Sequence, residues 1–193
     1  MFDFKEAEVT KGSAYKEVIK PGISVVKVTS ITNGLSSQKQ SPYLEITVEE
    51  ADGSELKQQY YLNTVVGEGK TKCAWDISKN AILSLVAAAN NYDEVTAKTK
   101  MPNAQNAEEL ASKLSLLLVG KDFKLKVIGE EKIAQSGKRY VASSFAQGVF
   151  CEPKTTNPSK LFFSEEKNIK RLPATTSVVD STFSSPTNDG VAF

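Results

Sequence analysis

The sequence predicts a mainly β domain with helices inserted between its third and fourth strands. Short runs of alternating apolar and polar residues lie before residue 63 and after residue 120, whereas apolar residues recur at helical spacing between them. With 193 residues, of which 40% are hydrophobic, the chain can bury one core but not two large ones. We therefore expect one domain with appendages.

The first three strands are expected between residues 22 and 63. The run GISVVKVTSI carries β-branched residues on both faces, which is typical of a long strand that bends across a closed sheet. The runs YLEITVEE and ELKQQYYLN alternate apolar and polar residues, and an Asp-Gly turn signal separates them. They are therefore expected to form a hairpin.

Two helices and two further strands are expected after the hairpin. Apolar residues fall at helical spacing from Ile77 to Ala89, with Asp76 or Ser78 as the N-cap. The run AEELASKLSLLLVG predicts a second helix that stops near Gly120. The runs KDFKLKVIGEE and KRYVASSFAQGVF predict strands four and five.

This order of elements is that of the OB-fold, a five-stranded Greek-key barrel. The sequence thus predicts an OB-fold over residues 1–150, with two helices between strands three and four. An antiparallel sheet with helices on one face is the alternative, because periodicity does not show whether a sheet closes. We expect residues 151–172 to form a linker and a short helix, and residues 173–193 to form a flexible tail rich in Ser and Thr.

The composition argues against several classes of function. The chain has no histidine, which removes Ser-His and Cys-His nucleophiles and imidazole-ligated metal sites. Cys73 and Cys151 suit free thiols better than a disulfide framework. The segment TVVGEGKT differs from an ATPase phosphate-binding loop, because Thr64 stands where glycine is needed and CAWD delays the helix. We expect no enzymatic activity, no catalytic residue, no cofactor and no metal.

A resemblance to a known family spans roughly residues 22–153. Four segments carry it: SPYLEITVEE, WDISKNAILSLVAAA, LLLVGKDFKLKVIGEE and KRYVASSF. The chain has an extended strand, a hairpin, a helix that begins near a tryptophan, a Gly-Lys pair before strand four, and a last strand. This order resembles that of bacteriophage single-stranded DNA-binding proteins. The resemblance implies an OB-fold core with a flexible C-terminal tail. It also implies a protein that coats DNA in replication or recombination, in the host cytoplasm, and it leaves an oligomer open.

Binding of single strands without sequence choice needs lysines for phosphates and aromatic rings on which bases stack. Strand parity and loop position predict these nucleic-acid-binding residues: Lys27, Lys39, Tyr43, Lys57, Tyr61, Lys124, Lys126, Lys138 and Tyr140. The alternative is that alternating lysines form an ordinary solvated strand face. Gly67 and Gly69 are interpreted as hinges of a basic loop that carries Lys70 and Lys72 over the DNA. Trp75 fits a place in the core better than a stacking role.

The end of the sequence suggests a second kind of contact. Asp189 and Phe193 place an acid and an aromatic ring in one short peptide, and we predict that they bind replication or recombination proteins. The start, MFDFKEAEV, lacks the features of a secretory signal, and no run is long enough for a membrane span, so a cytoplasmic protein is expected. Because 24 basic residues barely exceed 23 acidic ones, a rival function stays open. This rival is a phage structural or assembly protein that uses a small β-barrel for protein contacts.

Overall fold

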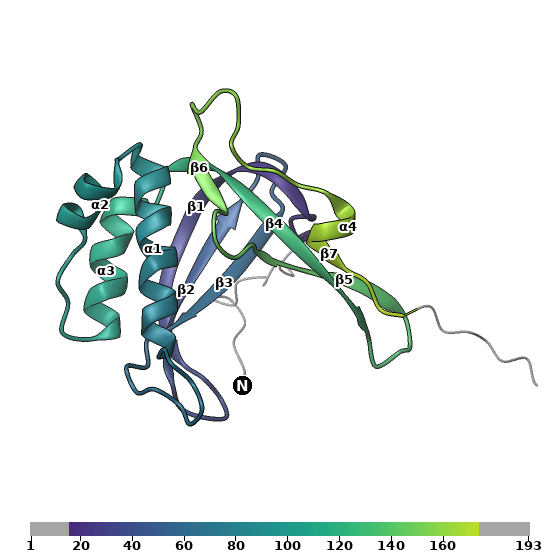
Figure 1. The fold of residues 1–193 in the computed structure, drawn as a ribbon, viewed down its shortest axis with the longest axis horizontal. Coiled ribbons are helices and arrows are strands. Elements are labelled where there is room, and N and C mark those ends of the chain that lie inside the picture. Colours follow the sequence, from purple (N-terminus) through teal and green to yellow (C-terminus); the bar gives the residue numbers. More distant parts are fainter. Residues whose placement is uncertain (1–15, 174–193) are drawn as a thin grey trace, which may run out of the picture.

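The computed structural model describes residues 16–173, and a strongly curved sheet dominates this part of the chain (Figure 1). The five longer strands lie in the order β3-β2-β1-β4-β5, with antiparallel neighbours, while β6 pairs antiparallel and β7 parallel with β4. The strands are β1 (Gly22–Leu35), β2 (Pro42–Glu49), β3 (Glu55–Tyr61), β4 (Asp122–Ile133), β5 (Arg139–Phe145), β6 (Cys151–Pro153) and β7 (Ile169–Lys170). The predicted mainly β class is confirmed.

The sheet is open, so the closure predicted for a barrel is not present. Strands β3 and β5 form its two edges. They approach each other without pairing, and the backbone N–H of Phe145 donates to Oε1 of Gln58 at 3.2 Å across the gap. Residues 17–19 occupy part of the β3 edge, because the N–H of Ile19 donates to the carbonyl of Glu55 and the N–H of Glu55 donates to the carbonyl of Glu17. This part of the β3 edge is therefore not available to β5.

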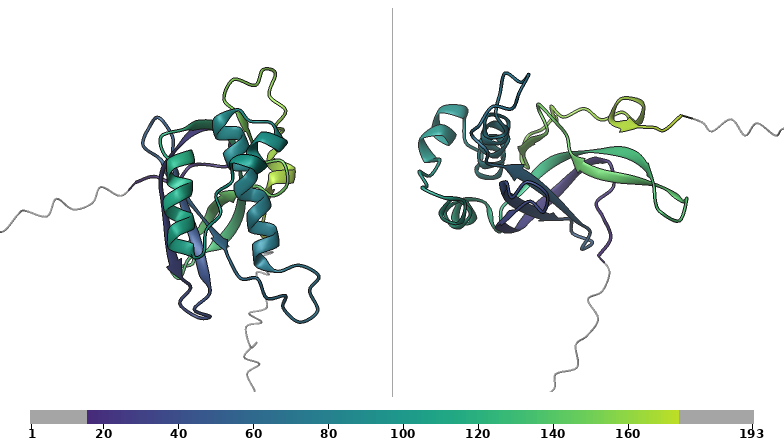
Figure 2. Two further views of the ribbon diagram at one scale, coloured as in Figure 1. Left: turned by 90° about the vertical axis from the view of Figure 1, so that its left-hand side faces the viewer. Right: turned by 90° about the horizontal axis from the view of Figure 1, so that it is seen from below.

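Three helices, rather than the predicted two, lie between β3 and β4: α1 (Ala74–Asn90), α2 (Glu94–Lys100) and α3 (Ala107–Leu118). They lie together on one side of the sheet, and the β4–β5 hairpin projects away from them (Figures 1 and 2). The predicted N-cap of α1 is wrong. The N-cap is Cys73, whose backbone N–H donates a hydrogen bond to the side chain of Asp76. The short helix α2 was missed because Ala97 is its one buried residue, so it has no apolar period.

The core lies between the inner face of the sheet and helices α1 and α3. Most of its fully buried side chains come from alternate positions of the strands and from one face of each helix, and Ile19 before β1 adds to them. They include Val26, Val28, Leu44, Ile46, Val48, Ile82, Leu85, Val86, Leu114, Leu118, Phe123, Leu125 and Val127. The alternation predicted for strands two and four is confirmed. In β1 the register shifts between Val28 and Ser30, so that Val28 and Ile31 both face inward.

Residues 151–172 contact the sheet at both ends, through the short strands β6 and β7. Strand β6 pairs with β4, and the predicted short helix is the four-residue α4 (Glu165–Asn168), which leads into β7. Gly129 of β4 lets the side chains of Pro21 and Val141 pack closely against the strand, because an added Cβ would lie 2.8 Å from Pro21 and 2.6 Å from Val141. The predicted tail lies outside the described residues beyond Pro173. No helix between residues 16 and 173 is long and apolar enough to cross a membrane.

Candidate nucleic-acid interface

Two of the predicted stacking residues lie side by side on the outward face of the sheet. Tyr43 and Tyr61 are direct cross-strand partners, and their rings meet edge to face with centroids 6.1 Å apart. Tyr61 is 40% exposed. Tyr43 is half-buried, because its ring lies so close to Gly34 that a Cβ there would be 2.7 Å from Cζ of the tyrosine. Tyr61 therefore offers the free aromatic surface, and Tyr43 supports it.

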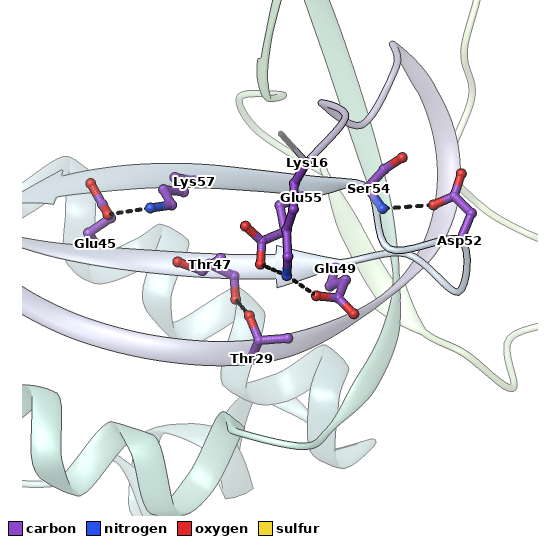
Figure 3. A network of polar contacts seen from close by, with 9 residues as sticks. All are labelled: Lys16, Thr29, Glu45, Thr47, Glu49, Asp52, Ser54, Glu55 and Lys57. Atoms are coloured by element: carbon purple, nitrogen blue, oxygen red, sulfur yellow. Dashed lines mark hydrogen bonds and ion pairs between the residues drawn. The ribbon is translucent and has the colours of Figure 1, made fainter. Parts of the chain in front are cut away.

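The charges on the rest of this face are largely paired, as Figure 3 shows. Nζ of Lys57 lies 3.9 Å from Oε1 of Glu45. Nζ of Lys16 lies 2.8 Å from Glu49 and 2.5 Å from Glu55. The hydrogen bonds to these carboxylates, first to Glu49, raise the pKa of Lys16, and the bond from Lys16 lowers the pKa of Glu49. These two lysines and three glutamates carry a net charge of −1, so this part of the face does not attract phosphates.

One region beside Tyr61 carries unpaired positive charge. A hollow of about 690 Å³ lies between the β1–β2 loop and the connector from β3 to α1. Its lining includes Tyr61 together with Lys39, Lys70 and Lys72, and it includes no carboxylate. Within residues 16–173 no ion pair is recorded for these three lysines. We call this region the basic hollow.

Local hydrogen bonds hold the two walls of the basic hollow together. In the β1–β2 loop, the N–H of Ser36 donates to the carbonyl of Ser41 at 2.9 Å, and the N–H of Ser41 donates to Oγ of Ser36 at 3.0 Å. Nδ2 of Asn63 in the connector donates to Oγ of Ser41 at 2.9 Å, which ties the connector to the loop. Gly69 has φ +69°, a conformation that favours glycine, in the turn that presents Lys70.

The remaining predicted residues lie elsewhere. Lys27 is exposed on β1 opposite Glu49 and Asp122. Lys126 is half-buried on β4. Lys138 and Tyr140 are exposed on the β4–β5 hairpin, which projects away from the helices (Figure 2). The structure thus brings Lys39, Tyr43 and Tyr61 to one end of the sheet but does not bring the hairpin residues to them.

Lys124 has a structural partner. Its side chain is 20% exposed, and Nζ lies 3.4 Å from Oε1 of the buried Glu152 and donates to the carbonyl of Thr156. An ammonium group held in this way has little capacity left for a phosphate. Lys124 is better explained as part of the packing of residues 151–160 on β4.

Lys70 and Lys72 were assigned to a basic loop but not to the predicted set of binding residues. The signal in the sequence was the glycine-rich basic stretch directly after the strand that carries Tyr61. Asp189 and Phe193, the predicted partner-binding residues, lie outside the described residues. No group of three potential metal-ligating side chains lies together in the part of the chain that the structure describes.

Comparison with known proteins gives no family for this chain. No protein-family model matches it, and no curated protein matches it in sequence. The basic hollow is therefore interpreted from its own residues. Its lysines provide positive charge, and Tyr61 provides an aromatic face beside them.

Proposed function

We propose that this protein binds single-stranded DNA without sequence preference and coats it during phage replication or recombination. The observation that carries the proposal is the basic hollow, which is lined by an exposed tyrosine and by three lysines that have no ion pair among the described residues. Positive charge along a groove and an aromatic face for bases are the two features that such binding uses. No catalytic residue, cofactor or metal is needed for it.

In the proposed complex, Lys39, Lys70 and Lys72 contact successive phosphates, and a base stacks on the ring of Tyr61. Flexible ammonium groups contact phosphates of any sequence, and every base has a face that can stack. A duplex fits less well, because its bases are already stacked and paired. The overall charge of +1 contributes little, so affinity depends on where these lysines lie.

We further propose that the sheet is an OB-fold that is open between β3 and β5. The strand order β3-β2-β1-β4-β5 would become a closed circuit if β5 paired with β3, and the Gln58–Phe145 contact lies at that gap. Helix α1 follows β3, as the OB-fold requires. OB-folds bind nucleic acids on the face of strands two and three, on the loop between strands one and two, and on the loop between strands four and five. The first two of these places belong to the proposed site. Tyr43, Tyr61 and Lys39 lie there.

Fluorescence anisotropy with a labelled dT oligonucleotide and a duplex of equal length tests the proposed function. We expect the protein to bind the single strand more tightly than the duplex, and unlabelled strands of different base composition to compete about equally. Preference for the duplex, or no binding at low salt, would contradict the proposal.

Tyr61→Ala and Tyr43→Ala should have different effects. Loss of the exposed Tyr61 ring should weaken oligo(dT) binding by about 5- to 150-fold, which corresponds to one base–aromatic stack of about 1–3 kcal/mol, and should change the Tm little. Tyr43→Ala should also lower the Tm, because the ring packs against Gly34. Anisotropy titrations and thermal unfolding measure the two effects, and Tyr61→Phe serves as the control that keeps the ring. Normal affinity in Tyr61→Ala would remove this residue from the site.

The alternative function, a phage structural or assembly protein, also has a structural observation in its favour. The β4–β5 hairpin exposes apolar side chains, including Ile133 (59% exposed) and Val141 (37% exposed). An exposed apolar patch on a projecting element suits a protein contact, as an assembly protein would use. Concentration-dependent self-association together with no affinity for oligo(dT) would favour this function.

A further inference from the structure

A second hollow lies on the other side of the β3–α1 connector, among the three helices. It measures about 700 Å³, and apolar side chains form most of its wall: Leu62, Trp75, Leu83, Met101 and Leu110. This volume is in the range of pockets that hold several side chains of a ligand. We call it the helical pocket. It shares no lining residue with the basic hollow, but residues of the β3–α1 connector, residues 62–73, line both hollows.

The charges at the helical pocket all have one sign. Lys79 and Lys98 are the charged residues of its lining, and no carboxylate belongs to it. Each lysine pairs with an acid one turn away on its own helix, Lys79 with Asp76 at 2.6 Å and Lys98 with Glu94 at 2.5 Å. These exposed pairs are weak, so the lysines can exchange them for an incoming carboxylate. The pocket therefore suits a ligand with a bulky apolar group and a nearby acid.

The chain itself contains such a ligand. Both phenylalanines after residue 173 follow an aspartate closely, Phe183 after Asp180 and Phe193 after Asp189, and no lysine or arginine occurs in residues 174–193. We propose that the helical pocket binds the segment of residues 180–193. A phenylalanine ring enters between Trp75 and Met101, and the preceding aspartate pairs with Lys79 or Lys98.

The length of this segment allows it to reach the pocket. From Pro173, Phe183 is 10 residues away and Phe193 is 20 residues away. At about 3.3 Å per extended residue, these lengths span up to about 33 Å and 66 Å. A folded unit of this size has a radius of gyration of about 15 Å and is therefore about 40 Å across. Pro173 lies at the β4–β5 hairpin, because its carbonyl accepts a hydrogen bond from Arg139, and this hairpin projects away from the helices (Figure 1). Phe193 can therefore reach its own pocket or that of a neighbouring copy, whereas the span to Phe183 is shorter than the molecule is wide.

The proposal does not depend on DNA binding, and its test uses no DNA. Trp75 is the only tryptophan of the chain and lines the helical pocket, so its fluorescence reports on this site alone. In the full chain, we expect Phe183→Ala with Phe193→Ala to expose Trp75. Its emission should shift to longer wavelength, and its acrylamide-quenching constant should rise about twofold.

A synthetic peptide of residues 180–193, added to this double variant, should restore the protection of Trp75. The same peptide with alanine at both phenylalanines should not. Leu83→Asp in the pocket wall should abolish the response, whereas Leu116→Asp, at a position that is 84% exposed on α3 and outside the lining, should keep it. Thermal unfolding checks that both variants fold.

Two results would overturn the proposal. One is an unchanged quenching constant in the double phenylalanine variant together with no effect of the peptide. The other is a quenching constant that falls with protein concentration equally in the wild type and the double variant, because a folded second copy would then cover the pocket.

Discussion

Replacing both Lys70 and Lys72 by glutamate is expected to reduce the affinity for oligo(dT) by about 10- to 100-fold at physiological salt. Each lysine that contacts a phosphate releases condensed counterions, and charge reversal adds repulsion to that loss. The slope of log K against log salt should become shallower by about 0.7 for each lost contact with a single strand. Anisotropy titrations at several salt concentrations measure both quantities.

The matched control changes the same net charge at another place. Lys100 on α2 and Lys167 on α4 are exposed and lie outside the basic hollow. Lys100→Glu with Lys167→Glu should leave the affinity within a few-fold of the wild type and the salt slope nearly unchanged. If both double variants lose affinity equally, the DNA responds to overall charge, and the basic hollow has no special role.

Glu152→Ala is expected to destabilise the fold by about 3 kcal/mol, at the lower end of what breaking a buried ion pair costs. Glu152 is 6% exposed and accepts hydrogen bonds from Oγ of Ser159 at 2.5 Å and from the backbone N–H of Lys160 at 2.8 Å, beside Nζ of Lys124. Its loss leaves these donors without their acceptor and leaves the mostly buried ammonium group of Lys124 without a carboxylate. In a domain of this size the Tm should fall by about 6–12 °C, which thermal unfolding measures.

The same group predicts a change of stability with pH. Burial alone would raise the pKa of Glu152, but the hydrogen bonds from Ser159 and Lys160 and the contact with Lys124 outweigh it and lower the pKa. A carboxyl group whose pKa is lower in the folded state stabilises the fold above its unfolded pKa, and this contribution is lost as pH falls through the folded value. The destabilisation by Glu152→Gln should therefore shrink below about pH 4. A destabilisation that is constant with pH would contradict this assignment.

In the regular strands, the alternation of apolar and polar residues correctly predicted which side chains face outward from the sheet. In β2 and β3 the inward Leu44 and Tyr60 fix Tyr43 and Tyr61 on the other face, since side chains alternate along a strand. The bulge after Val28 in β1 has no equally clear signal. The cap of α1 was placed too late because Asp76 resembles an N-cap, although it acts from the third helical position.

Long-range pairing is what the sequence did not reveal. Lys124 has the alternation of a solvated strand residue, but β6 brings Glu152 beside it from 28 positions further along the chain. In the same way, Lys57 on β3 lies 3.9 Å from Glu45 on the neighbouring strand β2. Counting lysines in a strand therefore overestimated the positive charge of the sheet face. The basic hollow depends on two loops that the hydrogen bond between Asn63 and Ser41 joins.

The most direct test of the central claim is to locate the DNA on the protein by ultraviolet crosslinking. The full chain is irradiated with oligo(dT), digested, and analysed by mass spectrometry for peptides that carry a nucleotide. We predict crosslinks at Tyr61 and within residues 65–72, and their loss when unlabelled single strands compete but not when duplex competes. Crosslinks confined to Tyr140 on the β4–β5 hairpin or to Trp75 in the helical pocket, or none above background, would contradict the assignment of the basic hollow as the DNA-binding site.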